Sequence, residues 1–404
     1  MKHEQSITSE IGKDSWKAGI WQGLRSRIRE AIEKVLDEEL CAVLGVARHE
    51  RSEARRGYRN GRQERTVVTE AGPATLSIPR GRFRAEDGRD REWRSAMLPA
   101  YQRRTRRVDE AIWGVYLAGA NSRRIRKALA PLLGAAALSK SSISRVVGRL
   151  KAAFLAWQEG DLSQEIYRVL YLDALYLSVR LARRVVKAPV QVALGVRPGG
   201  EKVVVAIELV LSESTANWID LVRSLGRRGL PEPILVVADG APGLLAAIRE
   251  TWPRARIQRC TNHKLDNLKL KVPRHAHAEL VRDYRAITHA LSGEHALRAY
   301  HRFLEKWRSL CPAAAASLEE AGMELLTFYR FPRSQWKSLR STNCLERVNE
   351  EFRRRVKTQG SFPNEGAALV LLYGLLAFGQ IRLRKIDGWK EIGLMEEAAL
   401  KDVA

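Results

Sequence analysis

The apolar residues of the N-terminal third recur mostly with helical spacing. Over residues 15–48 they return every three to five positions, with charged residues between them, which predicts an amphipathic helix. The segments Val108–Ala118 and Ser122–Leu133 show the same spacing, with Ser122 as the expected N-cap. A third helix is expected to open within Ser139–Val147. These segments predict a long helix followed later by a group of three shorter ones.

Strand-like runs lie between the first helix and the later three. Arg65–Val68 and Ala74–Ile78 are short β-type segments, and Gly72–Pro73 is the expected turn between them. The sequence therefore predicts a small β-structure before the three helices.

From residue 165 the pattern changes to buried strands. The expected strands are Ile166–Leu181, Pro189–Val196, Lys202–Leu211, Pro233–Ala238 and Ala255–Arg259. The expected helices between them are Ser214–Leu225 and Ala241–Thr251. The Gly-rich stretch Gly195–Gly200 is interpreted as a hairpin loop and not as a phosphate-binding loop. The order strand-strand-strand-helix-strand-helix-strand predicts an α/β fold with a mixed sheet flanked by helices.

The last third of the chain is helical in pattern. Residues 261–330 contain no strand-like run, and residues 342–358 form a highly charged helix. Gly366–Arg384 is a hydrophobic helix, whose apolar run is about two-thirds of the roughly 20 residues that a membrane span needs. We therefore expect a buried core helix there and no membrane span.

Composition and charge narrow the class of protein. The 404 residues are 45% hydrophobic and 29% charged, which excludes a wholly disordered or fibrous chain. The net charge of +24 predicts a polyanionic partner, with nucleic acid first and an anionic membrane surface second. The four cysteines show no CxxC spacing, and the N-terminus has no apolar signal segment. We therefore expect a cytoplasmic protein without a disulfide framework.

Two segments are candidates for DNA contact. Residues 51–107 carry 16 Arg, no Lys and 7 acids, so their net charge is +9. Arg matches phosphate geometry well, although a solvated basic linker is the alternative. Residues 108–160 resemble a helix-turn-helix, although any three-helix bundle can look alike. The residues expected to contact DNA there are Arg123, Arg124, Lys140, Ser141, Ser144 and Arg145.

Two acids occur in strand contexts where a carboxylate is costly. Asp173 lies within an apolar strand, and Asp239 ends the strand Pro233–Ala238. Such an acid needs a partner, a proton or a metal ion. These two acids are therefore candidate metal ligands.

Glu346 is the candidate for a third acid. On a helix, Asn343, Glu346, Asn349 and Glu350 share one polar face, and Glu350 and Glu351 compete with Glu346 for the ligand role. Basic residues that could contact a phosphate backbone follow on the same helix, namely Arg347, Arg353, Arg354 and Arg355. A surface helix with Glu350–Arg354 and Glu351–Arg355 ion pairs is the alternative.

Three carboxylates suit phosphodiester cleavage and strand transfer. Two Mg²⁺ ions, for which Mn²⁺ can substitute, can activate a water or a 3′-hydroxyl and stabilise the leaving oxygen. No GxSxG or GxxxxGK[ST] motif is present, so neither a serine hydrolase nor an ATP-binding loop is expected.

The motifs around these acids resemble the Mutator-type transposases of bacterial insertion sequences, the insertion-sequence 256 family. The resemblance begins near residue 30 and rests on these segments: Tyr58–Gly61, Ile78–Arg80, Asp173–Arg180, Ala238–Leu244, Gln258–Lys264, Ser341–Asn349, Arg353–Arg355 and Gly360–Asn364. One departure is Ala241–Pro242, where the family often has a His.

The resemblance implies a ribonuclease-H-like catalytic domain with an Asp-Asp-Glu triad and an all-helical insertion before the Glu. By motif, Asp173, Asp239 and Glu346 take these roles, and they are separated by 66 and 107 residues. The resemblance also places His263 near the acids, in contact with DNA. A Cys260–His263 zinc half-site and a structural Cys–His pair are the alternatives for these two residues.

We therefore expect a DDE-type transposase with four regions. Residues 1–50 are a helical region for dimerisation, 51–107 an Arg-rich DNA-contacting segment, and 108–160 a helix-turn-helix-like region. Residues 161–404 are the catalytic domain, with the helical insertion at about 261–335. The expected partners are double-stranded DNA, as terminal inverted repeats and target, and a second copy of the chain, at the bacterial nucleoid.

Two other hypotheses remain open on the sequence. The first is a non-catalytic DNA-binding regulator or a domesticated, inactive relative, which would keep the basic regions without needing the acids. The second is a structure-selective nuclease on the same fold, which would lack strand transfer.

Overall fold

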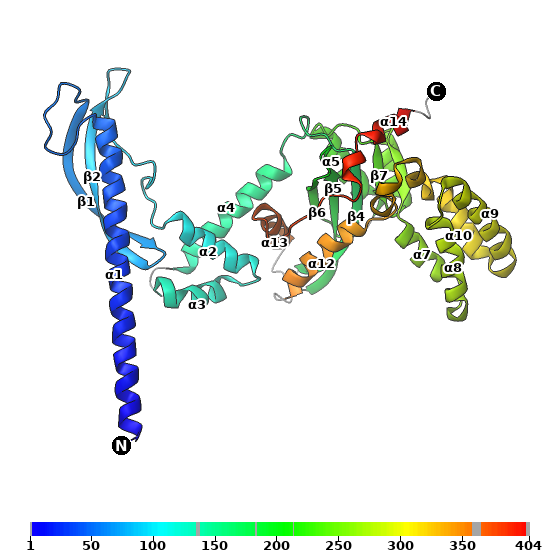
Figure 1. The fold of residues 1–404 in the computed structure, drawn as a ribbon, viewed down its shortest axis with the longest axis horizontal. Coiled ribbons are helices and arrows are strands. Elements are labelled where there is room, and N and C mark those ends of the chain that lie inside the picture. The colour runs from blue at the N-terminus through cyan, green and yellow to red at the C-terminus, as the bar shows by residue number, and fades with distance from the viewer. Residues whose placement is uncertain (1, 135–137, 182–183, 213, 358–364, 401–404) are drawn as a thin grey trace. The chain divides into compact units, whose positions relative to one another are not determined.

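The computed structural model describes residues 2–134, 138–181, 184–212, 214–357 and 365–400 (Figure 1). The chain forms two compact units, Met1–Arg149 and Leu150–Ala404. Each unit is described below by itself.

The first unit begins with a long helix packed on a small sheet. Helix α1 (Lys2–Leu44) precedes the antiparallel strands β1 (Gly57–Thr69), β2 (Gly72–Arg84) and β3 (Asp90–Glu92). Leu36, Leu40 and Leu44 of α1 are at most 1% exposed and share a core with the sheet. A Cβ on Gly81 would lie 2.7 Å from a Leu40 methyl, so this glycine lets α1 approach β2 closely.

The structure contains the helix and the strands predicted for this unit, but their first and last residues differ from the predicted ones. The expected helix over 15–48 ends at Leu44, where Gly45 takes a positive φ of 73°. The expected turn at Gly72–Pro73 was wrong, because Gly72 already pairs with Thr69 and leaves Glu70 and Ala71 as the turn.

Three helices follow the small sheet, and the last of them extends beyond the first unit. They are α2 (Arg106–Leu117), α3 (Ser122–Leu133) and α4 (Lys140–Gln158), of which α4 crosses the division between the units. Ile112, Ile125 and Ile143 are fully buried in their shared core. The N-cap of α3 is Asn121 and not Ser122, because the Asn121 side chain accepts a hydrogen bond from the Arg124 backbone N–H.

A five-stranded mixed sheet organises the second unit (Figure 1). Its strands are β4 (Val169–Leu181), β5 (Arg184–Val196), β6 (Lys202–Leu209), β7 (Leu235–Ala238) and β8 (Arg256–Arg259). Their order is β6-β5-β4-β7-β8, with antiparallel pairing among β4, β5 and β6 and parallel pairing of β7 with β4 and β8. The predicted strand and helix order is confirmed, and the loop before β6 is the predicted hairpin loop.

Helices α5 (Thr215–Arg227) and α6 (Pro242–Thr251) share a core with one face of this sheet. Leu170 and Leu172 of β4 belong to that core. Side chains alternate along a strand, so Asp173 belongs to the opposite face. Helix α12 (Asn343–Lys357) packs against β4.

A helical segment connects β8 to α12. It contains α7 (Thr261–Lys269), α8 (His277–Thr288), α9 (Gly293–Leu310), α10 (Pro312–Ala321) and α11 (Trp336–Leu339), with short 3₁₀ turns between them. The 3₁₀ turns are Arg274–Ala276, Gly322–Leu325, Thr327–Arg330 and Arg333–Gln335. Helices α7 to α10 share one core, so the expectation of an entirely helical 261–330 is confirmed.

The chain ends with α13 (Glu365–Ala377), a 3₁₀ turn (Trp389–Glu391) and α14 (Leu394–Leu400). The expected helix Gly366–Arg384 stops at Ala377, and Gly379 has a positive φ of 63°. Helix α13 is short and contributes Leu371, Leu372 and Leu375, all 0% exposed, to the interior. Within the described ranges, no helix combines the length and apolarity that a membrane crossing requires.

Candidate active site

The first two acids of the predicted triad lie at neighbouring strand positions. Strands β4 and β7 are parallel, and Leu172 pairs with Ala238, so Asp173 and Asp239 each follow a paired residue. Asp173 is 7% exposed, and its carboxylate accepts a hydrogen bond of 2.9 Å from the Ala174 N–H. Asp239 begins the turn after β7, and its carboxylate accepts from the Ala241 N–H at 2.9 Å. The sheet therefore places the two acids at adjacent positions of neighbouring strands.

Glu346 lies in the first turn of α12, which packs against β4. Its charge acts on Asp173, as does the charge of Asp239, so the fold brings three remote segments into electrostatic contact. Among the described residues, however, no three His, Cys, Asp or Glu side chains are close enough to hold a metal ion. The three carboxyl groups therefore interact electrostatically without forming a closed ligand cluster.

The buried position changes the acidity of Asp173. Burial raises the pKa of Asp173 to about 6, the nearby His263 opposes this rise, and the charges of Asp239 and Glu346 add to it. A carboxyl group in this position gains from a cation beside it, and its oxygen atoms are the donors that Mg²⁺ prefers. The chemical type of these side chains, although not yet their spacing, is therefore compatible with magnesium.

Cys260 and His263 lie next to the acids but do not form a pair that closes a zinc site. The Cys260 sulfur is fully buried and lies 3.4 Å from both the backbone N and the hydroxyl of Thr342, which links the start of α7 to the start of α12. The Cys260 sulfur raises the pKa of His263 to about 10 against the effect of burial, and the charges of Asp173 and Asp239 raise it further. The raised pKa therefore favours the protonated form of His263 beside the two aspartates.

The four residues of the polar face predicted for α12 do not all lie on its exposed side. Asn349 is 2% exposed, so it belongs to the packed side of the helix, and its carbonyl oxygen has no hydrogen-bond partner among the described residues. Arg354, which the alternative of a salt-bridged surface helix paired with Glu350, is paired with Glu351, with a distance of 2.7 Å between the charged atoms.

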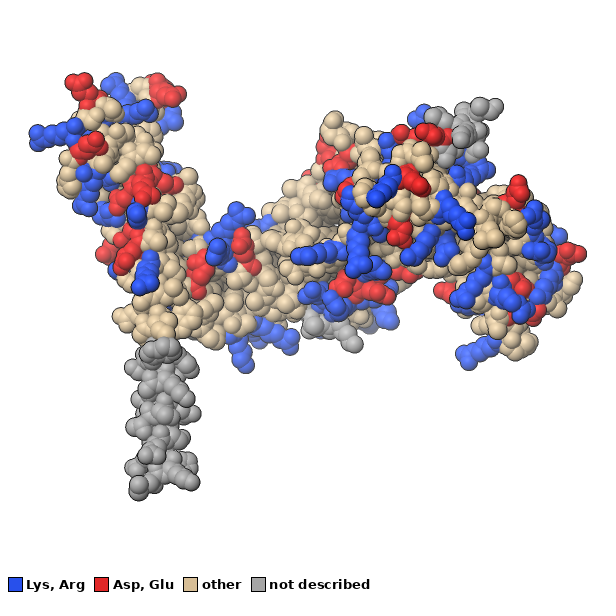
Figure 2. Space-filling view, viewed as in Figure 1, with Lys and Arg blue, Asp and Glu red and all other residues tan. Residues whose placement is uncertain are grey.

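The basic residues of α12 remain accessible. Arg347, Arg353 and Arg354 are exposed, and Arg355 is half-buried. Basic side chains gather around α12 on the face that Figure 2 shows. The motif segment Gly360–Asn364 lies outside the described residues.

The predicted helix-turn-helix residues all lie on the surface of the first unit. Arg123 and Arg124 are exposed in the first turn of α3, and Lys140, Ser141, Ser144 and Arg145 are exposed at the start of α4. Arg145 also lines a cleft of about 940 Å³ within this unit, together with residues of β1, β2 and the segment 93–104. The cleft therefore joins the Arg-rich sheet to the start of α4.

Besides Arg145, the cleft contains functional candidates that the sequence did not single out. Arg94, Arg103 and Arg145 are exposed and form no ion pair with any described residue, whereas Arg80 is paired with Glu92 at 3.1 Å. Tyr101 is 94% exposed at the cleft and has a positive φ of 67°, which is uncommon for a residue with a side chain. The only sequence signal for these residues was the high arginine content of 51–107.

The whole chain also matches known proteins. The model of the family "Transposase, Mutator family" matches residues 1–380. The transposase of insertion sequence element ISRM5 from Rhizobium meliloti is 35% identical over 353 residues, which is 87% of this chain and 86% of that protein. The transposase of IS406 from Burkholderia multivorans is 35% identical over 361 residues, 89% of this chain and 90% of that protein.

A more distant relative is also a transposase of an insertion sequence element. The transposase of IS256 in transposon Tn4001 from Staphylococcus aureus is 29% identical, over 85% of this chain and 86% of that protein. Among solved structures, the Drosophila P element transposase strand transfer complex has 11% identity and a TM-score of 0.27, with 72% of this chain and 84% of that chain covered. That TM-score is too low to support a comparison of folds.

These matches define the class of protein as a transposase of insertion sequence elements. The chain belongs to the Mutator family of transposases, as the motifs around its acids indicate.

Proposed function

We propose that this chain binds the terminal inverted repeats of an insertion sequence and catalyses Mg²⁺-dependent strand cleavage and strand transfer there. The observation that carries this proposal is the placement of Asp173 within β4 and of Asp239 directly after β7, at adjacent positions of two parallel neighbouring strands, with Glu346 acting on Asp173 from α12. The β6-β5-β4-β7-β8 order, with the first acid on the central strand, supports a ribonuclease-H-like catalytic domain interrupted by the helical segment before Glu346.

Asp173, Asp239 and Glu346 are the residues that would hold the metal ions. When bound, two Mg²⁺ ions would activate the attacking water or 3′-hydroxyl and stabilise the leaving oxygen. The sheet keeps the two aspartates fixed and partly shielded from water. The cationic His263 and the exposed Arg347 and Arg353 are placed to neutralise phosphates of the DNA backbone.

The first unit would grip the ends of the element. Its cleft carries arginines without acidic partners in the described part of the chain, beside the exposed start of α4. Arginine contacts to phosphates position a protein on DNA, and a helix that enters a groove reads the bases. The start of α4 is therefore the proposed reading element, and the sheet side of the cleft is the proposed backbone clamp.

Two ends must be held together for transposition, so we extend the proposal to a homodimer. Ile20, Trp21 and Leu24 of α1 are 41–49% exposed and could contact a second copy. The protein would act on chromosomal DNA in the bacterial cytoplasm.

The test is cleavage of DNA that carries the element's own ends, with Mg²⁺ or Mn²⁺. Asp173→Asn is expected to abolish cleavage while end binding stays within about twofold, because Asn keeps the size of the side chain and removes one ligand charge. The control Asp266→Asn changes an exposed acid paired with Lys269 and should leave cleavage unchanged.

Other outcomes would replace the proposal. Wild-type protein that binds the ends but does not cut them with either metal would favour a regulator or an inactive relative. Cleavage without joining of a preprocessed 3′-hydroxyl would indicate a nuclease.

A further inference from the structure

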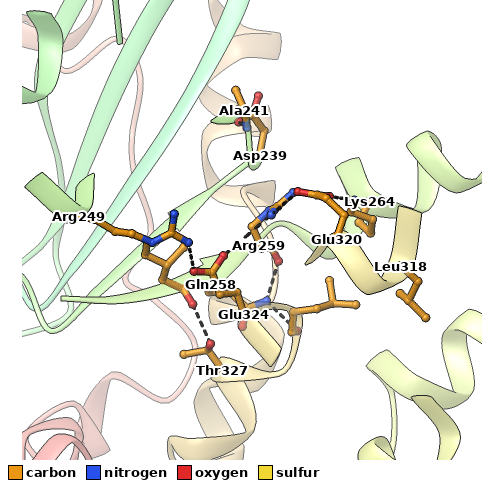
Figure 3. A network of polar contacts seen from close by, with 12 residues as sticks. Asp239, Ala241, Arg249, Gln258, Arg259, Lys264, Leu318, Glu320, Glu324 and Thr327 are labelled. Carbon is orange, nitrogen blue, oxygen red and sulfur yellow. Dashed lines mark hydrogen bonds and ion pairs between the residues drawn. The ribbon is translucent and has the colours of Figure 1, made fainter. Parts of the chain in front are cut away.

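Arg259 lies directly against the turn that follows Asp239. It is the last residue of β8 and pairs with Ala238, which precedes Asp239 on the neighbouring strand. A Cβ built on Gly240 would lie 1.9 Å from the Arg259 Nε and 2.2 Å from its Cζ. The guanidinium therefore occupies the space that a side chain at residue 240 would need, and Gly240 also has a positive φ of 96°. Figure 3 shows this guanidinium beside Asp239 and Ala241.

Glu320 from α10 fixes the orientation of this guanidinium. Arg259 donates from Nη1 to Glu320 Oε1 at 2.9 Å and from Nη2 to Oε2 at 3.1 Å, a two-pronged pairing. Lys264 of α7 donates to the same Oε2 at 2.7 Å and to the Ser317 carbonyl at 2.9 Å. Arg259 and Lys264 are only 3% and 2% exposed, so one carboxylate neutralises two buried cations.

The rest of the helical segment is fastened to the same strand. Gln258 donates to the Leu325 carbonyl at 3.0 Å and accepts from the Phe328 N–H at 2.8 Å. The Thr327 hydroxyl donates to the Ile257 carbonyl at 2.7 Å. Glu324 pairs with Arg249 of α6 and lies 3.9 Å from Arg259 (Figure 3). Of these contacts, those of Glu320 are the ones that connect the helical segment to the turn after Asp239, because Glu320 holds the Arg259 guanidinium.

We propose that Arg259, held by Glu320, is a positioning residue that fixes the Gly240 turn and thereby the carboxylate of Asp239. This inference rests on the proposed role of Asp239, and it assigns the helical segment a task in that site. Lys264 contributes by keeping Glu320 in place. A planar, two-pronged guanidinium suits this role because it cannot rotate while both of its nitrogens are engaged.

The first test measures amide hydrogen exchange in the peptide 238–244 of the full-length protein without DNA or metal. Glu320→Ala releases the guanidinium, and we expect exchange in this peptide to become about tenfold faster. Arg259→Lys keeps the charge but loses the two-pronged pairing, and should have the same effect.

The matched control is Glu319→Ala on the same helix. Glu319 pairs with Arg308 of α9 and touches none of the residues around Gly240 in the described contacts. It should leave exchange in 238–244 unchanged. Unchanged exchange in Glu320→Ala would overturn the proposal. Equal acceleration throughout α7–α10 and the strands would also overturn it, because Glu320 would then only stabilise the helical segment.

The second test measures cleavage of element-end DNA with Mg²⁺. Glu320→Ala and Arg259→Lys should lower the cleavage rate about 10- to 100-fold, as lost support of ligand residues commonly does, with the Kd for end DNA unchanged within about twofold. A normal cleavage rate in a variant with faster exchange at 238–244 would overturn the role in positioning Asp239. Failure of the wild-type protein to cleave would count against the proposed function, while the exchange result would still decide whether Arg259 fixes the turn.

Discussion

At the scale of single residues, burial of Asp173 makes the ionised form of its carboxyl group unfavourable when no metal ion is bound. Its pKa is raised to about 6, so the folded state keeps this proton over a pH range in which the unfolded state, with a pKa near 3.8, has lost it. Stability therefore falls as pH rises from about 4 to 6, and the full penalty applies above pH 6. A shift of about two units corresponds to about 3 kcal/mol.

Asp173→Asn should therefore stabilise the metal-free protein above pH 6, and the gain should shrink toward pH 4. Thermal unfolding of both proteins in EDTA at pH 5, 6, 7 and 8 measures this difference. A gain in Tm that is the same at every pH would show that the charge of Asp173 is not its source.

The sequence identified Asp173, Asp239 and Glu346 because each lies in a recognisable motif. It did not identify the partnership of Arg259 with Glu320. These two residues are 61 positions apart, and a single glutamate in the alanine-rich helix α10 has no motif around it. Nor did the sequence reveal Tyr101, whose exposure depends on the path of a loop.

At the scale of elements, helix α1 is buried near its end and exposed around Ile20. Leu40 is fully buried against the sheet at Gly81, whereas Ile20 is 49% exposed. Leu40→Ala should cost about 2–5 kcal/mol of stability in the first unit, since it leaves a cavity. Val35→Ala in the same helix, at a side chain that is 39% exposed, should change stability by less than about 0.5 kcal/mol.

Hydrogen exchange of the amides in β1 and β2 measures both variants in the full-length protein. Similar protection in the two variants would mean that α1 does not support the sheet through Leu40.

Elements in the second unit could be predicted better than those in the first. The strands β4 to β7 consist largely of apolar residues, which the pattern detects, whereas β8 is the short strand Arg256–Arg259. Strands β1 and β2 each span 13 residues, but only the Arg65–Val68 and Ala74–Ile78 portions were recognised. The rest is rich in arginine, so its backbone pairing leaves no alternation of apolar residues to detect.

At the scale of the whole molecule, the net charge of +24 predicts strongly salt-dependent DNA binding. Arg103→Ala should lower the slope of log Kobs against log salt concentration by about 1, because Arg103 has no acidic partner in the described part of the chain and lies in the cleft. Arg91→Ala is the control, since Arg91 is paired with Asp87 at 2.7 Å and lies outside the residues that line the cleft.

Fluorescence anisotropy with end DNA at several salt concentrations measures both slopes. An equal decrease in the two variants would mean that the cleft contributes no more than general surface charge.

The helical segment between β8 and α12 is attached to the strands and to α12 at one end, its base. The opposite end is its outer end. Hydrogen bonds of Gln258, Thr327 and Cys260 join its base to the strands and to α12. At the other end, Leu270 is 82% exposed. There the Cys311 sulfhydryl donates to the Lys271 carbonyl and joins the α9–α10 connection to the α7–α8 connection. Mutations in these connections can therefore accumulate without disturbing the acids. The outer end could therefore change, for instance to form a new protein contact, while the contacts of Arg259 with Glu320 and with the Gly240 turn are kept.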